Sequence, residues 1–150
     1  MSDIRELYQE VIIDHGRRPR NFGPLPGATH QQLGHNPLCG DQLTLYLIIQ
    51  DDKIAEVKFE GRGCAISMAS ASLMSEMLKG MSITDAELLF QNFHHLLTDK
   101  NPDQALLAKL GKLGVLSGVC AYPARVKCAT LAWHTLHAAI HGKPQAASTE

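Results

Sequence analysis

The chain has 150 residues, 45% of them hydrophobic and 19% charged, and its formal net charge is −1. This length and composition predict one globular domain with a substantial core. The near-neutral charge argues against nucleic acid as a partner, and no apolar run reaches the roughly 18 residues that a membrane helix needs. No secretory signal is visible at the N-terminus, so we expect a cytoplasmic protein. There, its four cysteines are expected to be metal ligands or reactive thiols rather than disulfides.

The N-terminal half predicts one helix followed by strands. Apolar residues at 4, 7, 8, 11 and 12 recur at helical spacing, and this helix should stop near His15-Gly16, before a basic turn. Residues 42–50 alternate between apolar and other side chains, which is typical of a half-buried strand. A turn at 51–53 and a second alternating segment around 57–59 predict a hairpin, and a short strand is expected at 33–36.

The C-terminal half predicts helices. The pattern is helical from Cys64 to Gly80, and a capping box formed by Thr84 and Glu87 is expected to start the next helix. We expect 98–121 to be irregular apart from a short helix at 103–110, and a long last helix to run from Pro123 to about 142. Strands followed by helices predict an α+β fold: a small antiparallel sheet of about three strands with helices packed on one face.

Four candidate metal ligands come from three separate segments. Cys39 and Asp41 precede the first long strand, Cys64 starts a helix and Cys128 lies in the last helix. Four such donors suit a tetrahedral site, and thiolate-rich sites select zinc, iron–sulfur clusters or cuprous ions. If the strand extends back to Cys39, Cys39 and Asp41 share one face. The alternative is a set of unconnected buried cysteines, because Cys is often buried without function and the chain lacks a CxxC pair.

Other chemistry-bearing residues have simpler explanations. His134, His137 and His141 share one face of the last helix, roughly 120° away from Cys128. We interpret them as favourable charge at a helix C-terminus rather than as a metal site. The adjacent His94 and His95 are expected at the surface.

Longer motifs connect these residues to a known family. The chain resembles the SufU branch of the U-type iron–sulfur cluster assembly proteins, which include IscU and the N-terminal part of NifU. The resemblance extends from about residue 4 to 142 and implies a single domain over 1–142, a family insertion at about 98–118 and a flexible tail at 143–150. It rests on Pro19-Arg20-Asn21, Asn36-Pro37-Leu38-Cys39-Gly40-Asp41, Phe59-Glu60-Gly61-Arg62-Gly63-Cys64 and Pro123-Ala124-Arg125-Val126-Lys127-Cys128.

The resemblance implies a metal site formed by Cys39, Asp41, Cys64 and Cys128. In the SufU branch this site holds zinc, and in the scaffold branch it holds iron or a transient [2Fe–2S] cluster. The long segment between Cys64 and Cys128 favours the SufU branch. So does Lys127, because scaffolds carry a histidine there and a protonated lysine cannot bind a metal.

The implied function is that of a sulfur acceptor rather than a stand-alone enzyme. Cys39 would take persulfide sulfur from a pyridoxal-phosphate-dependent, SufS-like cysteine desulfurase and pass it to downstream cluster-assembly proteins. The two alternatives are a cluster scaffold and a structural zinc module without sulfur chemistry. The candidate contacts with the desulfurase are the basic residues Arg17, Arg18, Arg20, Arg125 and Lys127. The alternative explanation is that these residues are ordinary solvated charges.

Overall fold

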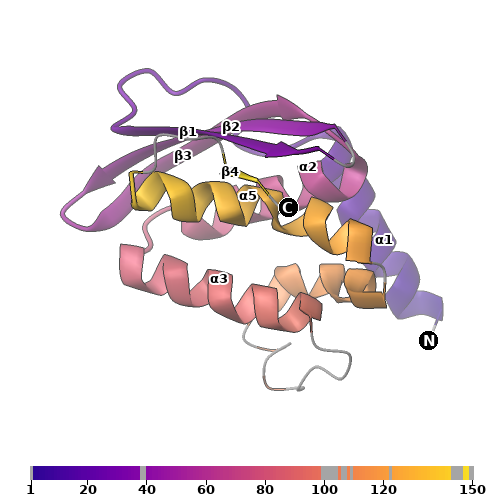
Figure 1. Ribbon diagram of the computed structural model, residues 1–150. Helices are drawn as coiled ribbons and strands as arrows, with labels where there is room; N and C mark the ends of the chain where they lie inside the picture. Colours follow the sequence, from indigo (N-terminus) through magenta and orange to yellow (C-terminus); the bar gives the residue numbers. More distant parts are fainter. Residues whose placement is uncertain are drawn as a thin grey trace.

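Figure 1 shows a computed structural model of the chain, which describes residues 2–37, 40–98, 105, 108, 110–121, 123–142 and 147–148. The α-helices are α1 (Ser2–Arg17), α2 (Ala65–Leu78), α3 (Ile83–Thr98) and α5 (Pro123–Ile140), and η1 (Gly111–Ala121) is a 3-10 helix. The strands are β1 (His30–Asn36), β2 (Asp41–Gln50), β3 (Lys53–Arg62) and β4 (Ala147–Ser148). Within these residues, no helix has both the length and the apolar character needed to span a bilayer.

The strands form one sheet in the order β3-β2-β1-β4. β2 is antiparallel to both β1 and β3, so the expected three-stranded antiparallel sheet is confirmed. β4 adds two residues parallel to β1. Asp51 and Asp52 have φ angles of 52° and 61°, which are the left-handed conformations of a tight hairpin turn. The hairpin expected from the 51–53 turn is therefore also confirmed.

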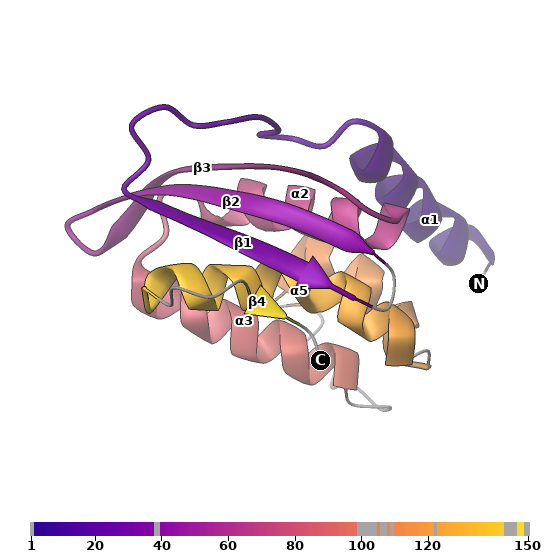
Figure 2. The same ribbon diagram turned by 45° about the horizontal axis from the view of Figure 1, so that its top comes forward.

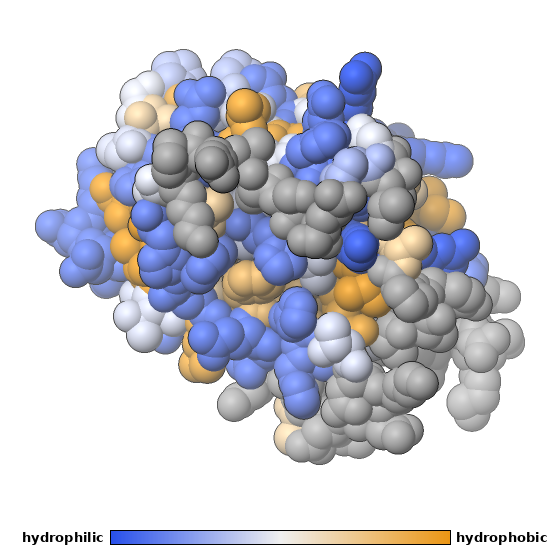
Figure 3. All heavy atoms as spheres, in the orientation of Figure 1, coloured by the Kyte–Doolittle hydropathy of each residue, from blue (hydrophilic) through white to orange (hydrophobic). Residues whose placement is uncertain are grey.

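The helices cover one face of the sheet, as expected. In Figures 1 and 2, α2 and α5 lie directly against the strands, and α3 lies beyond them. Leu43, Leu45 and Leu47 of β2 point into this core and are buried, whereas the alternating Thr44 and Tyr46 are half-buried. Figure 3 shows hydrophilic side chains over most of the described part of the face that it presents.

Small side chains let α2 and α5 approach closely. The Ser70 hydroxyl donates to the Ala129 carbonyl at 2.5 Å and accepts from the Trp133 indole N–H at 3.1 Å. Both partners of Ser70 lie on α5, so a serine that is fully buried still has its polar group satisfied. These contacts fix α5, and with it Cys128, relative to α2.

Two expectations for the second half of the chain are wrong. α3 begins at Ile83, and its cap is Ser82, whose hydroxyl accepts from the Asp85 N–H at 3.1 Å. Thr84 and Glu87 therefore form no capping box, and the Glu87 side chain is available for contacts with α5. The stretch 111–121 was expected to be irregular, but it is the 3-10 helix η1.

The burial pattern explains why η1 is regular. Leu110, Leu113 and Leu116 are spaced three residues apart and are fully buried. A 3-10 helix has three residues per turn, so this spacing places all three side chains on one face toward the core. Of the helix expected at 103–110, the structure describes residues 105, 108 and 110, which are helical. Most of the expected insertion at 98–118 outside η1 lies beyond the described residues.

Candidate metal centre

Asp41 reaches the site because β2 starts there. It is only 1% exposed and lies on the same face of β2 as Leu43 and Leu45. In the sheet register, Asp41 pairs with Asn36 of β1, and Gln42 pairs with Arg62 at the end of β3. The start of β2 is therefore flanked by the ends of both neighbouring strands, and Cys64 follows β3 by two residues.

The Asp41 carboxylate contacts Cys64 through both of its oxygens. Oδ1 accepts a hydrogen bond from the Cys64 backbone N–H at 3.0 Å, and Oδ2 lies 3.9 Å from Cys64 Sγ. Gly63 permits this approach, because a Cβ at Gly63 would lie 2.6 Å from Asp41 Oδ1. Burial of a charged carboxylate is costly unless it is both hydrogen-bonded and paired. A bound cation at this position would add the pairing that the Cys64 hydrogen bond does not supply.

Cys64 is the N-cap of α2. Its Sγ accepts from the backbone N–H of Ser67 at 3.4 Å, and its own backbone is extended, with φ −69° and ψ 166°. The positive end of the helix dipole and the free N–H groups of the first turn favour an anionic sulfur at this position. Cys64 is exposed, so reagents in solution can reach it.

Cys128 lies in the second turn of α5 and is 4% exposed. The Asn36 side-chain amide donates to Cys128 Sγ at 3.7 Å, and Asn36 is itself fully buried. The amide dipole therefore stabilises negative charge on this sulfur. Asn36 contacts the candidate site, although the sequence analysis quoted it only as part of a motif. No local signal in the sequence pairs it with Cys128.

The donor atoms of Asp41, Cys64 and Cys128 all lie within 4.8 Å of one another. Neither Cys64 nor Cys128 is in a disulfide. A tetrahedral zinc ion with Zn–S bonds of about 2.3 Å holds two sulfur ligands about 3.8 Å apart. Only small side-chain movements separate the observed arrangement from that geometry. A carboxylate and two thiol groups in this arrangement fit a thiophilic divalent cation.

Cys39 lies outside the described residues. Because β2 begins at Asp41 and Gly40 is in a turn with φ 72°, the alternation of the strand does not extend back to Cys39. The Gly40 N–H donates to the Asn36 carbonyl at 2.9 Å, which closes the connection between β1 and β2. The predicted role of Cys39 as a ligand thus remains a prediction.

The basic turn after α1 lies at the same end of the molecule as the site. A Cβ at Gly16 would lie 3.3 Å from the carbonyl oxygen of Ala65, the residue after Cys64. Arg17 and Arg18 are exposed, as is Arg125 at the start of α5, and Lys127 is half-buried. Basic residues thus lie at the end of α1 and in the first turns of α5.

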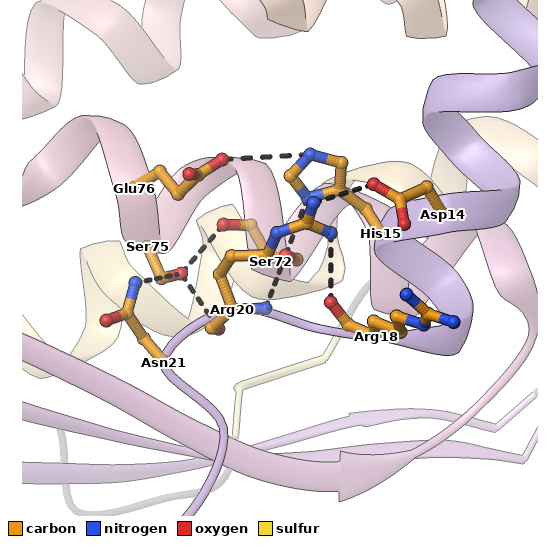
Figure 4. Close-up of polar contacts among 8 residues, drawn as sticks. All are labelled: Asp14, His15, Arg18, Arg20, Asn21, Ser72, Ser75 and Glu76. Atoms are coloured by element: carbon orange, nitrogen blue, oxygen red, sulfur yellow. Dashed lines mark hydrogen bonds and ion pairs between the residues drawn. The ribbon is translucent and has the colours of Figure 1, made fainter.

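Arg20 contacts its own turn and the end of α1, as Figure 4 shows. Its guanidinium contacts the Asp14 carboxylate at 2.6 Å and donates to the Arg18 carbonyl at 2.9 Å. The hydrogen bond from Arg20 lowers the pKa of Asp14 below its ordinary value. Arg20 therefore shapes the turn that presents Arg17 and Arg18.

The same turn is attached to α2 by a partly buried hydrogen-bond network (Figure 4). The Ser72 hydroxyl contacts His15 Nδ1 at 2.7 Å and accepts from the Arg20 backbone N–H at 2.8 Å, and the Asn21 amide donates to Ser75 at 3.1 Å. His15 is 3% exposed, and burial together with the nearby Arg20 charge lowers its pKa. The network fixes α1 against the helix that Cys64 caps.

Comparisons with known proteins agree with this architecture. The NifU-like N-terminal domain family matches residues 7–129. The chain is 39% identical over 139 residues to the zinc-dependent sulfurtransferase SufU of Bacillus subtilis (strain 168), covering 93% of this chain and 92% of that protein. It is 40% identical over 141 residues to the iron–sulfur cluster assembly scaffold protein IscU of Streptococcus pyogenes serotype M1, covering 93% and 86%.

Solved structures show the same fold. The crystal structure of FiSufU, a SUF-system protein from Fervidobacterium islandicum AW-1, matches with a TM-score of 0.79 at 36% identity, covering 91% of this chain and 98% of that one. The N-terminal NifU-like protein of Brucella abortus matches with a TM-score of 0.79 at 21% identity, covering 92% and 94%, and supports the fold alone. The chain belongs to the NifU-like N-terminal domain family of iron–sulfur cluster assembly proteins, within which its named relatives include SufU and IscU. The expected family resemblance is confirmed.

Proposed function

We propose that the protein is a zinc-bound sulfur acceptor for iron–sulfur cluster assembly. The observation that carries the proposal is the convergence of the donor atoms of Asp41, Cys64 and Cys128 within 4.8 Å. These donors come from a strand, a helix N-cap and a helix interior, so the fold itself assembles the site. The name of the Bacillus subtilis relative, zinc-dependent sulfurtransferase, supports the same reading.

Cys39 is the proposed fourth ligand. Asn36 and Asp41 are paired across the two strands, and Cys39 lies two residues from Asp41 along the chain. Two residues span at most about 7 Å, so Cys39 cannot be far from the Asp41 carboxylate. A zinc ion held by Cys39, Asp41, Cys64 and Cys128 would keep the thiols deprotonated without introducing redox chemistry.

The chain's own contacts divide the ligands into two kinds. Asp41 is buried and fixed by the Cys64 N–H, and Cys128 is buried and fixed by the Asn36 amide. Cys39 belongs to the connection between β1 and β2, where a ligand can leave and return with the least disturbance of the core. We therefore assign Asp41, Cys64 and Cys128 to holding the metal and Cys39 to accepting sulfur.

The acceptor step is a thiol exchange. The Cys39 thiolate attacks the outer sulfur of a cysteine persulfide on the desulfurase. A new S–S bond forms on Cys39, the S–S bond on the desulfurase breaks, and the electron pair leaves with the desulfurase cysteine as a thiolate. The sulfur keeps its oxidation level, so the transfer needs no other oxidant or reductant. The reverse chemistry delivers sulfur to downstream cluster-assembly proteins.

The proposed partner is a pyridoxal-phosphate-dependent cysteine desulfurase of the SufS type. We assign contacts with this partner to Arg17, Arg18, Arg125 and Lys127, and Arg20 would hold the turn that carries Arg17 and Arg18. We place this exchange in the cytoplasm, where thiols stay reduced. One domain over 1–142, with an insertion at about 98–118, is the proposed functional unit.

A cluster scaffold is the second candidate. The Streptococcus pyogenes relative is named a scaffold protein, and the same thiols and carboxylate can bind iron or a [2Fe–2S] cluster. Lys127 favours the sulfur acceptor, because a cation occupies the position directly before Cys128 and supplies no ligand while protonated.

Elemental analysis of the anaerobically purified protein, combined with its absorption spectrum, tests the proposal. We expect zinc bound at the cysteine site, no iron and no absorption bands in the visible range. Asp41→Ala should lower zinc retention, whereas Asp85→Ala, an exposed carboxylate at the start of α3, should leave it unchanged. Iron with visible bands that disappear in Asp41→Ala would support the scaffold instead.

A further inference from the structure

A second cluster of metal-ligating side chains lies at the other end of α5. His137 is nine residues beyond Cys128 on the same helix, which corresponds to a rise of about 14 Å. His137 and His141 are four residues apart and therefore lie on one helical face. Their ring centroids are 4.3 Å apart. The cluster is therefore separate from the cysteine site.

Glu87 of α3 completes this cluster. Its Oε1 lies 3.6 Å from His137 Nδ1 and 2.5 Å from His141 Nε2. The three donor atoms all lie within 4.8 Å of one another. Glu87 is available for this role because Ser82, rather than a Thr84–Glu87 capping box, caps α3.

We propose that Glu87, His137 and His141 form a second site for a divalent transition-metal ion of the zinc class. Two imidazoles and one carboxylate are the protein ligands of an open, three-ligand zinc site, which leaves a position for water or another ligand. In a tetrahedral site with Zn–N bonds of about 2.05 Å, two nitrogen ligands lie about 3.3 Å apart. The observed separations need only small side-chain rotations to reach that value.

Two features of the surroundings suit a bound cation at this cluster. The cluster lies at the C-terminal end of α5, where the helix dipole favours a cation. Phe90 of α3 packs against His137 with a centroid distance of 6.1 Å, and against His134 at 5.2 Å. This packing restricts the ring of His137, so less side-chain entropy is lost when a metal binds.

The cluster is accessible and can be changed without damage to the core. The side chains of His137, His141 and Glu87 are 44%, 46% and 32% exposed. A neighbouring cavity of about 410 Å³, whose lining includes Phe90, His94, His95 and His134, is not lined by any of the three proposed ligands. Because the ligands themselves are partly exposed, a metal ion has a path from solvent, and substitution of a ligand leaves no buried cavity.

Isothermal titration with zinc chloride, on full-length protein whose cysteine site already holds its metal, tests this proposal. We expect wild type to bind one further equivalent. Glu87→Gln, His137→Asn and His141→Asn should each weaken that binding about 100-fold or more, since loss of an outer hydrogen-bond partner alone costs 10–100-fold. His95→Asn, an exposed histidine on α3 outside the cluster, is the matched control and should bind like wild type.

Histidine ring nitrogen spectra provide a second readout that does not depend on function. Zinc should shift the His137 and His141 ring signals together at one equivalent and leave the His95 signal in place. Wild type that takes up no further equivalent overturns the proposal. So does unchanged binding in both the His137→Asn and His141→Asn variants. Because these readouts do not involve the thiols, their failure would leave the proposed sulfur transfer unaffected.

Discussion

Asp41 and Cys64 are joined by a hydrogen bond of 3.0 Å from the Cys64 backbone N–H to the Asp41 carboxylate, although 22 residues separate them in the chain. The same carboxylate lies 3.9 Å from the Cys64 sulfur. One side chain thus links the start of β2 to the N-cap of α2 and also takes part in the proposed metal centre. Substitutions that disturb this contact should lower metal affinity more strongly than they lower the stability of the fold.

Gly63→Ala tests how closely the backbone must approach Asp41. The added Cβ would lie 2.6 Å from Asp41 Oδ1, so the carboxylate has to move away from the Cys64 N–H. We expect overpacking to lower the free energy of unfolding by about 1–3 kcal/mol, and zinc affinity to fall with it. Chelator competition and urea unfolding measure the two effects. The neighbouring exposed Arg62→Ala is the control, and equal zinc affinity in both variants would contradict the prediction.

Asn36→Ala tests the hydrogen bond to the Cys128 sulfur. The buried amide donates to Sγ at 3.7 Å and should stabilise its anionic form. Loss of such an outer partner typically lowers metal affinity 10–100-fold, and we expect a decrease of about that size in zinc competition assays. Gln32→Ala changes another largely buried amide of β1 and should have a much smaller effect. If the two variants lose affinity equally, Asn36 has only a structural role.

Gly34 and Thr135 provide a coupled pair that fixes β1 against α5. A Cβ at Gly34 would lie 2.0 Å from Thr135 Oγ1. Gly34→Ala should therefore destabilise the fold by about 1–3 kcal/mol, as overpacking does. Thr135→Ala removes the clashing oxygen, so the double variant should be more stable than the sum of the single changes predicts. Thermal and urea unfolding of all four proteins measure this coupling, and strict additivity would refute the contact.

His15 predicts a pH dependence of stability. Its pKa is lowered in the folded protein, mainly by burial, relative to the ordinary value of 6.5. The unfolded chain then binds more protons than the folded one between the lowered pKa and 6.5, so stability falls as the pH drops through this window. His15→Gln cannot be protonated there, and its stability should fall less than that of the wild type as the pH is lowered from 8 to below 6.5. Urea unfolding measures the stability of both proteins at each pH. The same pH dependence of stability in wild type and His15→Gln would contradict this account.

The sequence predicted the sheet well because burial alternates along its strands. In β2, side chains with apolar and polar character face opposite sides, and period-two patterning specifies a strand and its face without any tertiary information. The long α5 was predictable from the helical spacing of its buried residues. The four candidate ligands were recognisable from their motifs.

Contacts between distant segments were not predictable. The sequence contains no local signal that pairs Asn36 with Cys128, or His15 with Ser72, because these contacts depend on how β1, α1 and α2 pack. The sequence predicted Glu87 to be a capping residue, but the structure shows that Ser82 caps α3. η1 was missed because its glycines suggested irregular chain, whereas burial at every third residue determined its form.

The central claim is that Cys39 accepts sulfur while Asp41, Cys64 and Cys128 hold the metal. The most direct measurement is mass spectrometry of the zinc-loaded protein after incubation with a cysteine desulfurase and cysteine. It compares the wild type with Cys39→Ala. The matched control is Cys120→Ala, which changes the one cysteine of the sequence outside the proposed ligand set. We predict that wild type and Cys120→Ala gain one sulfur atom on the Cys39 peptide, and that Cys39→Ala gains none. A sulfur atom on Cys64 or Cys128 in wild type, or a normal rate of persulfide formation in Cys39→Ala, would contradict the account.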